Sequence, residues 1–227
     1  RTWTDDAAVH RILVGEGPSN DLAALGFEAV DEAAWTATVE RLADAGFAAT
    51  EADTGACAER RVARLASVDA PWGSAVEVVL GLERGTEAAP TPLVPGGFLT
   101  AGQGFGHAVV ATTAFDEAIR FATDGLGLVQ SDYLLTELAP GLELEVRFLH
   151  CNARHHTLAI ARAPFELPQH LHHVMVETND RDDVGAAFAA AMKSPIVRTF
   201  GYLDGLLNST TGRLMTAVIG ASCFIGS

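Results

Sequence analysis

Five histidines form three short clusters near the middle of the chain, and their type and spacing suit metal binding or proton transfer. The clusters are His107, the pair His155–His156 and the pair His172–His173, each beside apolar residues that predict a β-strand. Imidazole is the commonest transition-metal ligand and titrates near neutral pH. A single histidine beside valines is more often a hydrogen-bonded core residue. The recurrence of the pattern therefore favours a metal site that faces into a β-structure.

The alternation of side chains along a strand restricts which histidines can share one site. Successive residues point to opposite faces of the sheet, so only one member of each histidine pair can face a given site. His107 shares its face with Val109. For the pairs His155–His156 and His172–His173, alternation alone leaves both members as candidates.

Three segments around these histidines resemble one enzyme family. They read GGFLTAGQGFGHAVV at 96–110, FLHCNARHHTLA at 148–159 and LHHVMVE at 171–177. In them the chain resembles the type I extradiol ring-cleavage dioxygenases, in particular the 2,3-dihydroxybiphenyl dioxygenase group of the vicinal oxygen chelate superfamily. The resemblance is strong from about residue 95 to residue 201, weaker from 20 to 95, and ends after Gly201.

The resemblance implies roles for five residues. It makes His107 and His173 ligands of a non-haem Fe(II) and His156 the nearby acid/base group, and it puts Val109 and Phe148 in the wall of a ring-binding pocket. The implied reaction cleaves a catechol such as 2,3-dihydroxybiphenyl with O2, in the catabolism of aromatic compounds. Two histidines and a carboxylate leave one face of the metal open for both substrates, and these ligands do not exclude Mn(II). A neutral imidazole beside the ring could take up or return a proton.

The third metal ligand of the family, a glutamate, has no match in this chain. No glutamate follows Glu177, which lies four residues after His173, roughly 13 Å away at the usual strand rise. Asp204 is the only acidic residue beyond Asp183 and is the candidate third ligand, although an aspartate before a glycine is also typical of a turn. The alternatives are an inactive relative that binds an aromatic ligand without turnover, and a glyoxalase-like metal enzyme.

The composition restricts the partners and the compartment. A net charge of −14 over 227 residues argues against nucleic acid, because phosphate contacts need a basic surface. No apolar run approaches the 18 or so residues of a membrane span, so we expect no membrane partner and a small-molecule substrate. Three widely spaced cysteines suit a reducing compartment rather than a disulfide framework. We expect a cytoplasmic homo-oligomer.

Helical and strand periodicities predict repeated α+β units. Apolar stripes predict helices over residues 31–45, 113–125 and 182–195, and a strand precedes each of them. Alternation of apolar and charged residues predicts a strand at 142–148, and an apolar run after a turn predicts another at 76–80. This order predicts an internal βαβββ repeat in which two modules enclose one cup, as the family resemblance also implies.

A proline-rich segment at 84–95 predicts a linker between two domains. Domain one, residues 1–90, contains His10 as its single histidine and is predicted to be non-catalytic. Compared with the family, its first module is truncated at the N-terminus. Domain two, residues 96–227, contains every candidate metal ligand.

Overall fold

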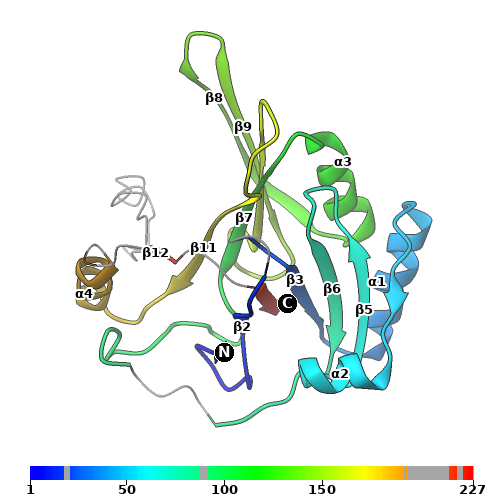
Figure 1. Ribbon diagram of the computed structural model, residues 1–227, viewed down its shortest axis with the longest axis horizontal. Helices are drawn as coiled ribbons and strands as arrows, with labels where there is room; N and C mark the ends of the chain where they lie inside the picture. Colours follow the sequence, from blue (N-terminus) through cyan, green and yellow to red (C-terminus); the bar gives the residue numbers. More distant parts are fainter. Residues whose placement is uncertain (18–20, 87–90, 192, 194–214, 219–221, 227) are drawn as a thin grey trace.

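Two modules of similar order make up most of the fold, which we describe from a computed structural model (Figure 1). The structure describes residues 1–227 apart from 18–20, 87–90, 192, 194–214, 219–221 and 227. The first module comprises β3 (Ala24–Ala29), α1 (Glu32–Asp44), β4 (Thr50–Glu51), α2 (Thr54–Arg60), β5 (Arg64–Asp69) and β6 (Ala75–Leu80). The second comprises β7 (His107–Thr112), α3 (Phe115–Arg120), a π-helical turn η1 (Phe121–Gly125), β8 (Val129–Ala139), β9 (Leu142–His150) and β10 (Leu158–Arg162). The predicted tandem βαβββ arrangement is confirmed.

Short elements extend the modules into two sheets. They are β1 (Thr2–Trp3), β2 (Ile12–Leu13), β11 (Leu171–Glu177), α4 (Arg181–Ala191), β12 (Met215–Val218) and β13 (Ser222–Gly226). The strand orders are β1-β2-β13-β3-β6-β5-β4 and β12-β11-β7-β10-β9-β8. In each module the first strand lies parallel to the last, β3 beside β6 and β7 beside β10. The division into domains near residues 90–96 stays a prediction, and β13 pairs with β2 and β3 of the first sheet.

Helix α1 illustrates how the local sequence sets the bounds of an element. The side chain of its N-cap Asp31 accepts a hydrogen bond from the Ala34 amide at 2.8 Å, which satisfies one free N–H group of the first turn. Just past the helix, Gly46 has a φ of +87°, which glycine adopts without strain. Trp35 and Leu42 are the buried residues of the helix. The helix predicted at 31–45 is confirmed.

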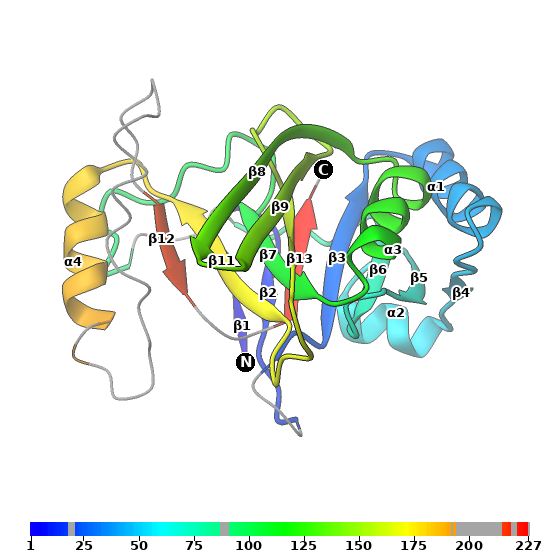
Figure 2. The same ribbon diagram turned by 90° about the horizontal axis from the view of Figure 1, so that it is seen from above.

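One large core joins the two modules. Helix α1 packs against η1, and Figure 2 shows α1 and α3 side by side. A Cβ atom added at Gly125 of η1 would lie 2.9 Å from Cδ2 of Leu42 in α1, so glycine permits this close approach. Trp72 and Phe121 meet edge to face, with ring centroids 5.3 Å apart. Residues of both modules belong to this single cluster of buried side chains.

On the face of each sheet that is turned away from this core, apolar side chains form a separate, smaller cluster. On the second sheet Val109 and Ala159 are buried together, and Phe148 packs beside them. On the first sheet Leu65 and Val79 belong to a cluster of their own. The face of Val109 is the one on which alternation places His107, so the second sheet presents the predicted site residues on the side opposite the main core.

Strands β8 and β9 form a hairpin that projects beyond the rest of the molecule (Figure 1). The strand predicted at 142–148 lies within β9 and is confirmed. Its outer end is not half-buried as predicted, because the hairpin extends past the core: Leu142 is 40% exposed, and Tyr133 and Leu135 on β8 are each 60% exposed. Among the helices in the described ranges, none is long and apolar enough to span a membrane.

Candidate metal centre

His107 and His173 lie on adjacent antiparallel strands. Strand β11 pairs with β7 so that His173 opposes Val109 and Met175 opposes His107. The Nε2 atoms of His107 and His173 are 3.4 Å apart. Two nitrogen ligands about 2.1 Å from one ion are separated by roughly 3.0 to 3.4 Å, for bond angles between octahedral and tetrahedral. The structure therefore brings both histidines within reach of one ion.

His107 is buried in surroundings that keep its ring neutral. A Cβ atom at the preceding Gly106 would lie 2.0 Å from the carbonyl oxygen of Met175, so only glycine lets β7 begin this close to β11. Burial, together with nearby His156 and His173, lowers the pKa of His107 well below its usual value. Its Nδ1 atom has no hydrogen-bond partner among the described residues. Neutral imidazole is the form that coordinates a metal.

His156 lies in a bend, so the strand predicted around it was wrong. Residues 151–157 precede β10 without forming part of a strand. Asn152 Oδ1 accepts a hydrogen bond from the Arg154 amide at 3.0 Å, and this local bond turns the chain away from an extended conformation. The bend still brings the His156 ring to the site, where its centroid is 4.0 Å from that of His107.

Burial also lowers the pKa values of the other two imidazoles. The pKa of His156 falls from 6.5 to about 4, mainly through burial and further through the neighbouring His155 and His173. The pKa of His173 falls to about 4, through burial and the adjacent His172. At neutral pH these rings are uncharged, so each has a nitrogen lone pair that can bind a cation or accept a proton.

An apolar wall adjoins the histidines. Phe148 of β9 pairs with Ala159 of β10, which in turn pairs with Val109 of β7. All three side chains belong to one apolar cluster. The ring centroid of Phe148 lies 4.9 Å from that of His156. Phe148 therefore lies beside the histidine predicted to transfer protons and Val109 lies opposite His173, an arrangement that suits a flat aromatic ring.

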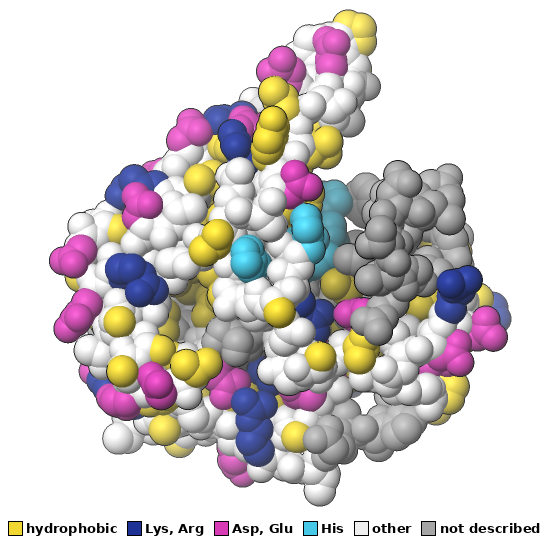
Figure 3. Space-filling model, turned by 180° about the vertical axis from the view of Figure 1, so that it is seen from behind, with side chains coloured by type: hydrophobic (Ala, Val, Ile, Leu, Met, Phe, Trp, Pro, Cys, Tyr) yellow, Lys and Arg dark blue, Asp and Glu magenta, His cyan; other side chains and the backbone are white. Residues whose placement is uncertain are grey.

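The remaining members of the histidine pairs do not face away as strand alternation requires. His155 Nδ1 lies 2.9 Å from His156 Nδ1, and His155 Nε2 lies 3.6 Å from an oxygen of Asp132. His172 Nδ1 lies 2.7 Å from His173 Nδ1. Alternation fails because His155 is in the bend and because the β7–β11 register shifts just before His173. Figure 3 shows the histidine side chains gathered below the projecting hairpin.

Known proteins provide an independent comparison. The profile of the Glyoxalase/Bleomycin resistance protein/Dioxygenase superfamily matches residues 104–196. The chain is 39% identical over 212 residues to a biphenyl-2,3-diol 1,2-dioxygenase of Metapseudomonas furukawaii and 38% identical to one of Paraburkholderia xenovorans, covering 92% of this chain in each case. The crystal structure of a halotolerant catechol dioxygenase matches with a TM-score of 0.76 at 26% identity, covering 100% of this chain and 74% of that one. Residues 104–196 thus form a domain of this superfamily, and the chain as a whole is similar to biphenyl-2,3-diol dioxygenases.

The superfamily match and the similarity to these dioxygenases confirm the family resemblance and the fold that the sequence predicted. The chain spans 65% and 66% of the lengths of the two curated relatives, just under two thirds of each. The similarity to the halotolerant catechol dioxygenase extends over the whole chain, so it includes both βαβββ modules and not only the profile match at 104–196.

Asp204, the candidate third ligand predicted in place of the missing glutamate, lies outside the described residues. Glu177 does not replace it, because its Oε2 atom lies 3.7 Å from the Nη1 atom of Arg154. Among the described residues, no group of three histidine, cysteine, aspartate or glutamate side chains is arranged to hold a metal ion. The described part of the chain thus brings together the three imidazoles of His107, His156 and His173, whose predicted roles as ligands and acid/base group stay predictions.

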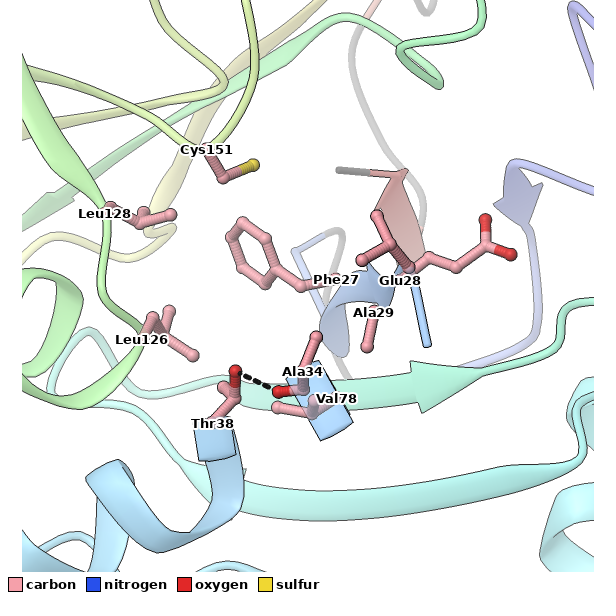
Figure 4. A pocket seen from close by; sticks show the side chains of 10 residues that line it. Phe27, Glu28, Ala29, Ala34, Thr38, Val78, Leu126, Leu128 and Cys151 are labelled. Carbon is pink, nitrogen blue, oxygen red and sulfur yellow. Dashed lines mark hydrogen bonds between the residues drawn. The ribbon is translucent and has the colours of Figure 1, made fainter. Parts of the chain in front are cut away.

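A separate apolar pocket lies between the two modules of the superfamily fold (Figure 4). Phe27 and Val78 line it from the first module, and Leu126, Leu128 and Cys151 line it from the second. Burial raises the pKa of the Cys151 thiol, so the sulfur stays protonated at neutral pH. The pocket contains none of the site histidines, and its lining fits a contact between modules better than a place for catalysis.

Proposed function

We propose that this chain carries out extradiol ring cleavage of a catechol such as 2,3-dihydroxybiphenyl, with O2 and a non-haem Fe(II) held by His107, His173 and Asp204. One observation supports this most strongly. Two neutral imidazoles have Nε2 atoms 3.4 Å apart, a third imidazole lies against them, and an aromatic side chain borders the group. The similarity to biphenyl-2,3-diol dioxygenases supports the same assignment.

The residues fit a divalent ion of this kind. The separation of the Nε2 atoms of His107 and His173 matches ligands of one ion, and His107 has its other nitrogen buried without a partner among the described residues. Imidazole nitrogen with one carboxylate oxygen suits Fe(II), and the same donors accept Mn(II). When bound, Fe(II) supplies a centre at which a catechol and O2 meet and exchange electrons.

His156 supplies the proton transfer in this proposal. Its low pKa, about 4, leaves the ring neutral at neutral pH, so it can accept the proton that a catechol hydroxyl loses on binding. The same ring can return that proton to a developing oxygen anion later in the reaction. Phe148 and Val109 form an apolar wall that orients the catechol ring and keeps water from it.

The third ligand and the setting complete the proposal. Asp204 supplies the carboxylate, which lowers the net charge of the site and strengthens binding of the ion. Domain two, residues 96–227, carries the ligands while domain one supports it. We further propose a cytoplasmic location and a homo-oligomeric state; the free Cys57 and Cys151 suit a reducing compartment.

The test is ring cleavage by the chain after anaerobic loading with Fe(II). Oxygen uptake and the yellow ring-opened product from 2,3-dihydroxybiphenyl are measured, together with bound iron, for the unaltered chain and for Asp204→Ala. The proposal expects cleavage by the unaltered chain, and loss of iron retention in the variant. Binding of the catechol without oxygen uptake would support an inactive ligand-binding relative. Full iron retention in Asp204→Ala would remove that residue from the ligand set.

A further inference from the structure

We propose that Arg154 is a positioning residue that fixes the place of His156 relative to His107. The inference rests on the proposed function, because it assigns His156 the proton transfer. Arg154 lies two residues before His156 in the bend, and its side chain is only 10% exposed. Among the described residues its Nε atom has no hydrogen-bond partner, so the partners of its two Nη groups show what the side chain holds in place.

The guanidinium binds the segment that leads into His107. Its Nη2 group lies within hydrogen-bond distance of three backbone carbonyl oxygens at 3.2 to 3.4 Å, those of Leu99, Thr100 and Gly104. Residues 99–104 end three positions before His107. The two N–H groups of Nη2 are shared among these three carbonyls, and the planar fork leaves Nη1 free to contact a carboxylate on its other side. Arg154 thereby joins the bend to the approach of β7.

Two further contacts extend the same junction. Asn152 Nδ2 donates to the carbonyl oxygen of Gln103 at 3.2 Å, so a second residue of the bend binds the same segment. Arg154 Nη1 lies 3.7 Å from the carboxylate of Glu177, which follows His173 on β11. One guanidinium thus contacts all three parts of the chain that carry the site histidines: the approach to His107, the bend and β11.

The contacts of Arg154 and Asn152 fix the distance between the His107 and His156 rings, on which the proposed proton transfer depends. The rings of His107 and His156 lie 4.0 Å apart between centroids, yet His156 belongs to a bend and not to a strand. A ladder of backbone hydrogen bonds fixes a strand residue, whereas a bend needs side-chain contacts to hold it. In the described part of the chain no hydrogen bond joins Arg154 to His107, His156 or His173, and its charge helps to lower the pKa of His107, so we assign its main effect to the position of His156.

The experiment compares Arg154→Gln and Arg154→Lys with Arg162→Gln. Arg162 is a matched control, since it follows the bend on β10 and pairs with Asp116 and Glu145 away from the histidines. We expect Arg154→Gln to keep its iron and to lower kcat by about 10²-fold, as a displacement near 1 Å does, with KM changed less than roughly threefold. Arg154→Lys should recover part of that loss, and Arg162→Gln should leave kcat unchanged.

A double variant separates positioning from general damage. If Arg154 acts through His156, adding Arg154→Gln to His156→Phe should lower kcat no further. The inference would be overturned if the loss of kcat in the double variant equalled the product of the two single losses. Equal losses of kcat in Arg154→Gln and Arg162→Gln would also overturn it. If Arg154→Gln does not fold, the same comparison with Arg154→Lys decides, because a lysine ammonium reproduces only part of the guanidinium contacts and should lower kcat by a smaller factor.

Amide hydrogen exchange tests these Arg154 contacts separately from the proposed function. If the chain cleaves no catechol, the proposed function fails, but the exchange measurement still decides whether Arg154 joins the two segments. Loss of the guanidinium should speed exchange in 99–107 and in 151–157 together, while Arg162→Gln leaves both segments as they are. Unchanged exchange in these two segments in Arg154→Gln would show that Arg154 does not hold them together.

Discussion

The two βαβββ modules use the corresponding faces of their sheets in opposite ways. Against the first, buried charges neutralise one another: Arg11, which precedes the module and is 2% exposed, lies 2.7 Å from a carboxylate oxygen of Asp6 and 3.4 Å from one of Glu28 in β3. On the second, His107 and His173 converge as imidazoles that burial keeps neutral. Carboxylates that are already paired with an arginine do not bind a metal cation well, whereas neutral imidazole nitrogens that converge on one point can bind one.

Matching strand positions make the contrast specific. His107 is the first residue of β7, and Ala24 is the first residue of the equivalent strand β3. Two positions later the first module has Gly26 paired with Glu77, where the second has Val109 paired with Ala159. Glu77 is buried and binds Arg60 at 3.0 Å. The same backbone therefore supports an ion-pair network in one module and an apolar wall beside imidazoles in the other.

Replacing His107 by alanine should have the largest effect on iron binding, because it removes one of the two proposed imidazole ligands. The change also gives the second module the residue type that the first module has at this position. His107→Ala should retain no stoichiometric iron after anaerobic loading and gel filtration, since one imidazole and a carboxylate bind the ion too weakly. His170→Ala serves as the control, because His170 pairs with Asp21 at 3.0 Å away from the other imidazoles. Equal iron content in the two variants would refute the assignment of His107.

Breaking the charge balance of the first module should cost stability and leave metal binding intact. Arg11→Met leaves Asp6 and Glu28 without their buried partner, and we expect the free energy of unfolding to fall by about 3–5 kcal/mol in urea titrations. Arg61→Met removes an exposed pair with Glu83 and should not move the unfolding midpoint measurably. Similar midpoints for both variants would mean that the buried network does not stabilise the first module.

Removing the proton-transfer group should slow the reaction without releasing the metal. For His156→Phe we expect kcat to fall by about 10²-fold or more, the usual contribution of a general acid/base, with iron content unchanged. His170→Ala is the control, because His170 pairs with Asp21 and not with His156. Turnover in His156→Phe equal to that of the unaltered chain would deny the residue its proposed role.

Acid should weaken the metal-free second module. The pKa values of His156 and His173 are about 4 in the folded chain and 6.5 when unfolded, so the unfolded state binds more protons between these values. Their contribution to stability is complete above pH 6.5 and is lost as the pH falls toward 4, by up to about 1.4 kcal/mol per pH unit and group. Urea unfolding at about pH 7 and about pH 5 measures this. His156→Phe should show a smaller decrease, and an equal decrease would contradict the assignment.

Sequence patterns predicted the regular parts of the fold well. The predicted strand at His107–Thr112 coincides with β7, and the predicted helix at 31–45 contains α1 with its N-cap at Asp31. Both elements depend on local signals, namely side-chain periodicity and helix capping, which can be recognised in the sequence itself. The exposed tip of the β8–β9 hairpin was not predictable, because burial depends on how far the strand extends past a core that local periodicity cannot reveal.

The site was only partly predictable, for a similar reason. Alternation and the family resemblance together predicted the meeting of His107 and His173. The bend that carries His156 depends on Asn152 and on contacts of Arg154 with carbonyls about fifty residues earlier in the chain, and no local pattern encodes such contacts. An asparagine and an arginine just before a histidine pair were the available signal against a strand there.

X-ray absorption at the iron edge of the Fe(II)-loaded chain tests the central claim most directly, that the second module binds one ion through His107 and His173. The account predicts one iron per chain with two imidazole nitrogens at about 2.1 Å, and a single imidazole in whatever iron His173→Ala retains. An unaltered imidazole count in His173→Ala, or no iron bound by the unaltered chain, would contradict it.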